Sequence, residues 1–158
     1  ITFCGQVSDP TLHPKFHELL AICIRKNKKV VVQTAVAVKP KIWWTKSFLM
    51  SRGKNVEWIF AIDGLPKDSN KYRVNQDGEK LYDIMLRCAS FGVNTQWQYI
   101  VFNYNEKDVE TCKNIANQHG IKFLQITSGR WGTEVLKSLQ PSENYSDISG
   151  VSVREYTK

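Results

Sequence analysis

Several polar residues that could bind a small ligand follow apolar runs of the sequence. They are Gly5, Gln6, Ser8 and Asp9 after the first run, Thr34 after the second, Asp63 after the third, and Asn103 and Glu106 after the fourth. Carboxylates, amides and hydroxyls supply hydrogen-bonding groups for such a ligand, and glycine lets the backbone approach it closely. This pattern predicts a polar site, assembled from the ends of several elements above an apolar floor.

The four cysteines, at positions 4, 23, 88 and 112, are too far apart to form a closely spaced metal-binding loop. Cys23, Cys88 and Cys112 each fall on the apolar side of an expected helix, where a cysteine is usually a small buried hydrophobe. Nothing in their spacing indicates a disulfide framework. We therefore expect a reducing, cytoplasmic environment.

Two other groups of residues have a chemical and a structural interpretation. His13 and His17 stand four apart, which is a zinc-ligand spacing, but no third ligand lies near them, so a structural role is favoured. The tryptophans could stack on bases. We expect those at 43, 44, 58 and 97 to pack in the core instead, because they occupy core-compatible positions.

The elements that must position these residues alternate along the chain. Strands are predicted at 1–4, 30–34, 57–63, 96–102 and 121–126, and helices at 14–27, near 40–49, at 76–91, from 105 to about 120, and at 133–139. Repeated strand–helix units of this kind predict a parallel sheet with right-handed crossovers.

The predicted fold class is therefore α/β, a partial TIM-like (β/α) barrel with a parallel sheet of about five strands and helices on its outer face. Ligands bind at the carboxyl ends of the strands in such barrels and in open doubly wound sheets. Residues 1–139 form the expected core. Residues 140–158 are polar and lack a clear period, which indicates a tail or linker.

Composition limits the classes of partner. The chain has 158 residues and a net charge of +7, and no apolar run approaches the roughly 18–20 residues that span a bilayer. Arg25, Lys26, Lys28 and Lys29 suit a helix C-terminus. Because phosphate binding needs clustered charge and the other cations are spread along the chain, we expect neither nucleic acid nor membrane as a partner.

Segment 3–16 carries a more specific pattern, FCGQVSDPTLHPKF. It is similar to the second-strand segment of radical S-adenosylmethionine (SAM) enzymes, where a Gly-rich turn ending in Glu-Pro or Asp-Pro precedes Leu-x-His-Pro-x-Phe. In that family the backbone of the turn receives the amino group of SAM. The resemblance implies that Gly5, Gln6, Ser8 and Asp9 contact SAM.

Later segments resemble the same family in the same order. FAIDGL at 60–65 resembles the fourth barrel strand, which ends in SxDG, and Tyr72-Arg73 resembles a pair whose arginine holds the SAM carboxylate. Segment 99–106 resembles the fifth strand, near adenine and ribose, and 125–131 resembles the sixth. The resemblance thus implies SAM contacts for Asp63, Arg73, Asn103 and Glu106. Thr34 is a further candidate for cofactor binding because it stands at a strand end.

Some of these candidates have alternatives. Asp63 could instead cap the turn at Gly64, and Arg73 could be a surface residue. Glu106 suits the first turn of a helix, which is the favoured interpretation. The sequence also departs from the family: Ala61 replaces the usual serine, and Gln33-Thr34-Ala35-Val36 replaces Thr-Asn-Gly.

The CxxxCxxC loop of the family is the largest departure, because its three thiolates hold a [4Fe–4S] cluster and its place would be upstream of Ile1. We therefore expect a SAM-binding core fragment of an enzyme that would reductively cleave SAM at a cluster supplied by a missing N-terminal segment. This chain alone would then be inactive. The alternative is a non-catalytic α/β domain that binds a ligand or protein and keeps the fold without the cluster.

A truncated barrel also predicts self-association. The strand at 1–4 would lack its neighbour, and an unpaired edge invites another chain. Part of the apolar barrel interior would also be open. We expect a possible homodimer through this open side.

Overall fold

The computed structural model of the chain describes residues 1–5, 8–128, 131–142 and 145. Its centre is one sheet of five parallel strands whose spatial order follows the chain order. The strands are β1 (Thr2–Phe3), β2 (Val30–Thr34), β3 (Val56–Ala61), β4 (Asn94–Val101) and β5 (Lys122–Thr127). The predicted α/β fold with a partial, barrel-like parallel sheet is confirmed.

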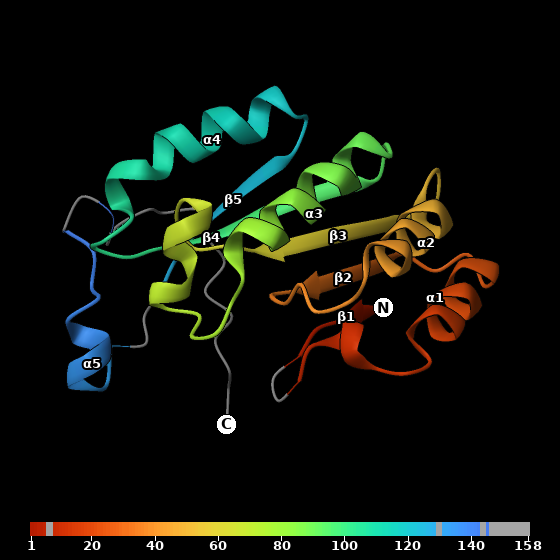
Figure 1. Cartoon of the computed structure of the whole chain (residues 1–158), viewed down its shortest axis with the longest axis horizontal. Helices are drawn as coiled ribbons and strands as arrows, with labels where there is room; N and C mark the ends of the chain where they lie inside the picture. The colour runs from red at the N-terminus through yellow and green to blue at the C-terminus, as the bar shows by residue number, and fades with distance from the viewer. Residues whose placement is uncertain (6–7, 129–130, 143–144, 146–158) are drawn as a thin grey trace.

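Four helices connect the strands. They are α1 (Phe16–Arg25), α2 (Lys41–Ser51), α3 (Gly78–Ser90) and α4 (Val109–Gln118). Because each strand pairs with the next along the chain, right-handed crossovers place all four on one face of the sheet. Figure 1 shows them following one another along that side. Short elements lie beyond the strand ends: the 3₁₀ helices η1 (Pro10–Leu12), η2 (Pro66–Lys71) and η3 (Glu106–Asp108), and the short helix α5 (Glu134–Lys137).

The core lies between the sheet and these helices. Alternate strand residues on this face are fully buried, among them Val32, Trp58, Phe60, Trp97 and Tyr99. Alternation of this kind fixes which face a strand presents. The core role expected for the tryptophans is confirmed, since those at 44, 58 and 97 are buried and the one at 43 packs against the core.

The other face of the sheet is open and half-buried. Its aliphatic residues, such as Ile59 and Ile100, alternate with polar pairs. Gln33 Nε2 donates to Gln98 Oε1 at 2.7 Å, and Lys122 lies 3.6 Å from Glu57. This face, which was expected to be apolar as a barrel interior, is therefore mixed, with aliphatic residues beside one amide pair and one ionic pair.

The described residues after α5 fold back onto the chain. Thr127 Oγ1 donates to the Tyr145 carbonyl at 3.1 Å, and Ser142 N donates to Glu106 Oε2 at 2.7 Å. A tail or linker at 140–158 stays a prediction, as does dimerisation through the open side. No helix in the described part of the chain is long and apolar enough to cross a membrane.

Candidate functional site

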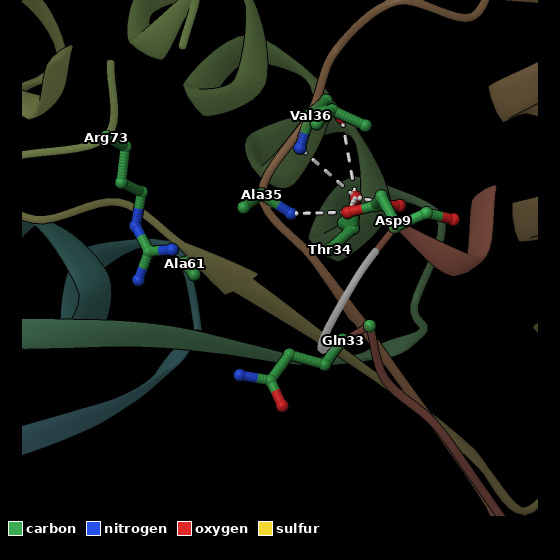
Figure 2. A pocket seen from close by; sticks show the side chains of 9 residues that line it. Asp9, Gln33, Thr34, Ala35, Val36, Ala61 and Arg73 are labelled. Carbon is green, nitrogen blue, oxygen red and sulfur yellow. Dashed lines mark hydrogen bonds between the residues drawn. The ribbon is translucent and has the colours of Figure 1, made fainter. Parts of the chain in front are cut away.

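A pocket lies where the carboxyl ends of β1, β2 and β3 meet. Its cavity measures about 290 Å³, and it is lined by Gly5, Ser8, Asp9, Gln33, Thr34, Ala35, Val36, Ala61 and Arg73. Figure 2 shows Asp9 on one side of this pocket and the Arg73 guanidinium on the other. The pocket thus has one cationic and one anionic wall, at the sheet edge where parallel α/β folds bind ligands.

Asp9 fastens the turn after β1 to the end of β2. Its Oδ1 accepts hydrogen bonds from the Thr11 amide at 3.0 Å and the Thr11 hydroxyl at 2.6 Å. Its Oδ2 accepts from the Thr34 hydroxyl and the Ala35 amide, both at 2.9 Å. Asp9 is also the N-cap of η1, a position that favours aspartate because its oxygens accept orphan amides. The carboxylate therefore fixes the pocket wall.

Gly5 is required by a close approach of the backbone. A Cβ atom at this position would lie 1.7 Å from the Ser8 carbonyl oxygen. Only glycine lets the chain turn this tightly against itself. Gly5, which was expected in a ligand-binding turn, lines the pocket and allows the backbone of Ser8 to approach it closely.

Arg73 reaches the pocket from the loop after η2 and is held there by Asp63. The Arg73 Nε donates to Asp63 Oδ2 at 2.7 Å, and the Ile100 amide donates to Asp63 Oδ1 at 2.8 Å. Asp63 is fully buried, so both of its oxygens are used beneath the pocket. In the described part of the chain the Arg73 Nη atoms have no such partner, which leaves them available for a ligand carboxylate.

Burial dominates the electrostatics of Asp63. It raises the pKa of this carboxyl above its usual value, and the Arg73 guanidinium and the Ile100 amide oppose the increase. Asp63 does not line the pocket, and its direct contact with a ligand stays a prediction. Its place in the structure is that of a residue that positions Arg73.

Gln76 joins the ends of β2 and β3. Its Nε2 donates to the Ala35 carbonyl at 2.8 Å and to the Ala61 carbonyl at 2.9 Å, and both of these residues line the pocket. Its Oε1 accepts from the Ser69 hydroxyl, which itself accepts from the Asp63 amide at 3.0 Å. One amide side chain thus holds two strand ends at a fixed separation.

The sequence-predicted site residues separate into two groups. Gly5, Ser8, Asp9, Thr34 and Arg73 line the pocket together, while Asp63 lies beneath it. Gln6 lies outside the described residues. The remaining two, Asn103 and Glu106, do not line the pocket.

Asn103 and Glu106 contact the C-terminal part of the chain instead. Asn103 Nδ2 donates to the Ser138 carbonyl at 2.6 Å, and Glu106 accepts from the Ser142 amide. Both stand near the end of β4 as expected. Their nucleotide contacts stay a prediction.

Four pocket-lining residues were not among the predicted candidates, namely Gln33, Ala35, Val36 and Ala61. Gln33 had a signal in the sequence, because a glutamine interrupts an otherwise apolar strand. The supporting pair of Gln76 and Ser69 had none, since the path of η2, which carries Ser69, and of the loop before α3, which carries Gln76, does not follow from spacing along the sequence.

The cysteines do not fit an iron–sulfur cluster. Cys4 is exposed, whereas Cys23, Cys88 and Cys112 are buried on separate helices. Burial raises the pKa of Cys88 and of Cys112 to about 12, and a cluster requires thiolates. No three potential ligands among the described residues lie close enough to hold a metal ion.

Comparison with known proteins identifies the architecture. Streptococcus suis SuiB bound to S-adenosylmethionine superposes with a TM-score of 0.68 at 9% identity, over 85% of this chain and 31% of SuiB. A domain of pyruvate-formate lyase-activating enzyme from Bacteroides vulgatus superposes with a TM-score of 0.58 at 15% identity, over 82% of this chain and 98% of that domain. These neighbours are radical SAM enzymes. This chain shares their fold, a parallel five-stranded sheet that is part of a barrel.

The likeness is one of structure. SuiB bound to the precursor peptide SuiA gives a TM-score of 0.65 at 11% identity and covers 87% of this chain. The chain spans about a third of the length of SuiB. No protein-family model matches the sequence, and no curated protein matches it. The family resemblance drawn from the motifs is thus confirmed for the fold.

Proposed function

We propose that this chain is the SAM-binding core of a radical SAM enzyme. The observation that carries the proposal is that two opposite charges, Arg73 and Asp9, line one pocket from opposite sides (Figure 2). The methionyl end of SAM carries an ammonium and a carboxylate. A guanidinium binds a carboxylate through parallel N–H donors, and the opposite wall attracts the ammonium.

The residues of the pocket divide this task. The free Nη atoms of Arg73 bind the carboxylate, while the Asp63 carboxylate holds Nε and so fixes the plane of the guanidinium. The turn around Gly5 and Ser8 presents carbonyl oxygens to the ammonium. The cavity of about 290 Å³ suits the amino-acid end of SAM, because sites for whole drug-sized ligands run from roughly 300 to 1,000 Å³.

In radical SAM enzymes, SAM bound to a reduced [4Fe–4S] cluster supplies a 5′-deoxyadenosyl radical. The four cysteines of this chain do not match the spacing that such a cluster needs. We therefore propose that radical chemistry would use thiolates other than these four. The residues described here bind and orient SAM.

A second candidate is a non-catalytic α/β domain that binds an amino-acid-like ligand. The scattered cysteines favour it, since they remove the signature of radical chemistry. In this candidate the same two charges of the pocket would bind an amino-acid-like ligand in place of SAM. Binding of methionine as tightly as SAM would support this candidate against the first.

Isothermal titration calorimetry with SAM, S-adenosylhomocysteine and methionine tests the proposal. The chain should bind SAM, and Arg73→Gln should weaken binding about tenfold or more, because a hydrogen bond to a charged group contributes about 1.5–3 kcal/mol. Arg52→Gln is the matched control, since Arg52 is exposed at the C-terminal end of α2 and does not line the pocket. Absence of SAM binding, or equal losses in both variants, would show that the pocket does not hold SAM.

A further inference from the structure

The positive charge of the chain resides in its first third. Residues 1–56 contain ten lysines and arginines against two carboxylates, whereas residues 57–158 contain twelve cations and thirteen carboxylates. Of the two carboxylates, Asp9 is engaged by Thr34 and Ala35. All five ion pairs among the described residues use cations from 57–158. The cations of residues 1–56 lie in α1 and α2 and in the segments next to these helices, and none of them forms an ion pair within the described part of the chain.

Aliphatic side chains stand among these cations on the outward side of two adjacent helices. We define the α1–α2 surface as Lys15, Leu19, Ile22 and Lys26 along α1 with Ile42, Lys46 and Leu49 along α2. Steps of three and four residues place each series on one side of its helix. The helices are neighbours, since His17 Nε2 lies 2.8 Å from Ser47 Oγ, and Figure 1 shows them side by side.

The outward side of α2 is unusually apolar for a surface helix. Trp44 and Phe48 already fill the core on its inward side, yet Ile42 is 75% and Leu49 56% exposed on the other. Surface helices normally present polar residues to water. An apolar patch rimmed by charges indicates a surface that another body covers.

We propose that the α1–α2 surface docks on an anionic lipid bilayer. A second copy of the chain does not fit, because a two-fold contact would set these cations against one another. Nucleic acid would match the charge and leave Ile42 and Leu49 without an apolar partner. Eight of the ten cations are lysines, and the exposed apolar residues are aliphatic.

This composition distinguishes a bilayer from a protein partner. Protein interfaces favour arginine and aromatic residues and are depleted in lysine. At a bilayer, lysine stems lie along the apolar surface while their ammonium groups reach the headgroups. Aliphatic side chains between them enter the boundary between headgroups and acyl chains. The α1–α2 surface thus combines the two contributions that strengthen binding to an anionic bilayer, electrostatic attraction and burial of apolar area.

Vesicle co-sedimentation of the 158-residue chain tests the proposal. The chain should sediment with vesicles of phosphatidylcholine mixed with phosphatidylglycerol and stay in solution with phosphatidylcholine alone, and salt should weaken the binding. The variant pair Lys26→Gln with Lys46→Gln should bind about thirtyfold more weakly, at about 1 kcal/mol for each lysine. The pair Ile42→Ser with Leu49→Ser should show a loss of about the same size, because it removes the apolar contribution.

Matched variants elsewhere separate the surface from general effects. Lys80→Gln with Lys107→Gln removes two exposed cations, and Val135→Ser removes an exposed aliphatic residue, all outside the α1–α2 surface. These controls should bind as the parent does. No sedimentation with anionic vesicles would overturn the proposal. So would a loss confined to the lysine variants together with tight binding of a single-stranded RNA, which would assign the surface to phosphate polyanions.

Discussion

Replacing Gln76 by leucine should loosen the rim of the pocket and destabilise the fold. Leucine keeps most of the volume and removes two donated bonds, to the Ala35 and Ala61 carbonyls at 2.8 and 2.9 Å, and one accepted bond from Ser69. A hydrogen bond contributes about 1 kcal/mol net, and a buried group left without a partner costs about 1–3 kcal/mol. Since Gln76 is partly exposed, we expect the free energy of unfolding to fall by about 2–4 kcal/mol.

Urea denaturation followed by tryptophan fluorescence and circular dichroism measures this change. With a slope of about 2 kcal/mol per molar urea, the midpoint should fall by about 1–2 M. Gln118→Leu is the control, because Gln118 is exposed at the end of α4. A midpoint for Gln76→Leu within about 0.25 M of that control would refute the bridging role.

A second variant isolates the donor function of the same side chain. In Gln76→Glu the ionised carboxylate has the right length and cannot donate to either carbonyl. We expect a loss at neutral pH at least as large as that of leucine. Lowering the pH should recover part of it, because a protonated glutamate can donate one hydrogen bond.

Three further expectations concern the site and the thiols. Asp9→Asn should lower the free energy of unfolding by about 1–2 kcal/mol in urea titrations, because an amide nitrogen at Oδ2 cannot accept from the Ala35 amide; an unchanged midpoint would contradict the clamp. Burial raises the Asp63 pKa in the folded chain, so folding takes up a proton and the contribution of Asp63 to stability declines as pH rises above the ordinary carboxyl value of about 4. A carbon-13 titration of Asp63 at or below that value would refute this. Cys4 should be the thiol that reacts rapidly with a disulfide reagent in the folded chain, since Cys88 and Cys112 are buried. For the same reason the chain should assemble no stable four-iron cluster from iron and sulfide. Rapid reaction of several thiols, or the visible absorption of a stoichiometric cluster, would contradict this placement of the cysteines.

The strands were predictable where burial on one face imposes a pattern. The run of residues 30–34 was predicted with the bounds that β2 has, because consecutive β-branched residues favour a strand, although the helices cover only one face of this strand and burial alternates along it. The start of β4 was set two residues late. Asn94 and Thr95 have no strand pattern of their own, and pair with Glu57 and Trp58 of β3. Pairing with β3 therefore extends β4 to residues whose own sequence does not favour a strand.

Contacts made by loops were not predictable in the same way. The helix expected from residue 105 starts with η3, and Asn105 is the N-cap position of that element without a capping hydrogen bond from its side chain. Its side chain instead accepts from the Phe102 amide and donates to the Ile100 carbonyl. Phe102 lies in the same turn and Ile100 lies near the end of β4, so the side chain closes the turn after the strand through local bonds to the backbone.

The site was predictable in its composition and less so in its geometry. The strand ends and the family motifs placed Gly5, Ser8, Asp9, Thr34 and Arg73 at one edge, and the structure brings them into one pocket. That Asp63 lies beneath Arg73 depends on the path of η2 and the loop after it, which spacing along the chain does not determine.

Amide chemical shifts of the chain during a SAM titration test the central claim most directly. The account predicts that the largest changes fall on the pocket residues Gly5, Ser8, Ala35 and Arg73, and that Arg73→Gln reduces them at equal SAM concentration. The amide shifts of residues whose side chains lie on the open face of the sheet, such as Glu57 and Gln96, should change little. Absence of shifts at millimolar SAM, or shifts confined to residues outside the pocket, would contradict the assignment of this chain as a SAM-binding core.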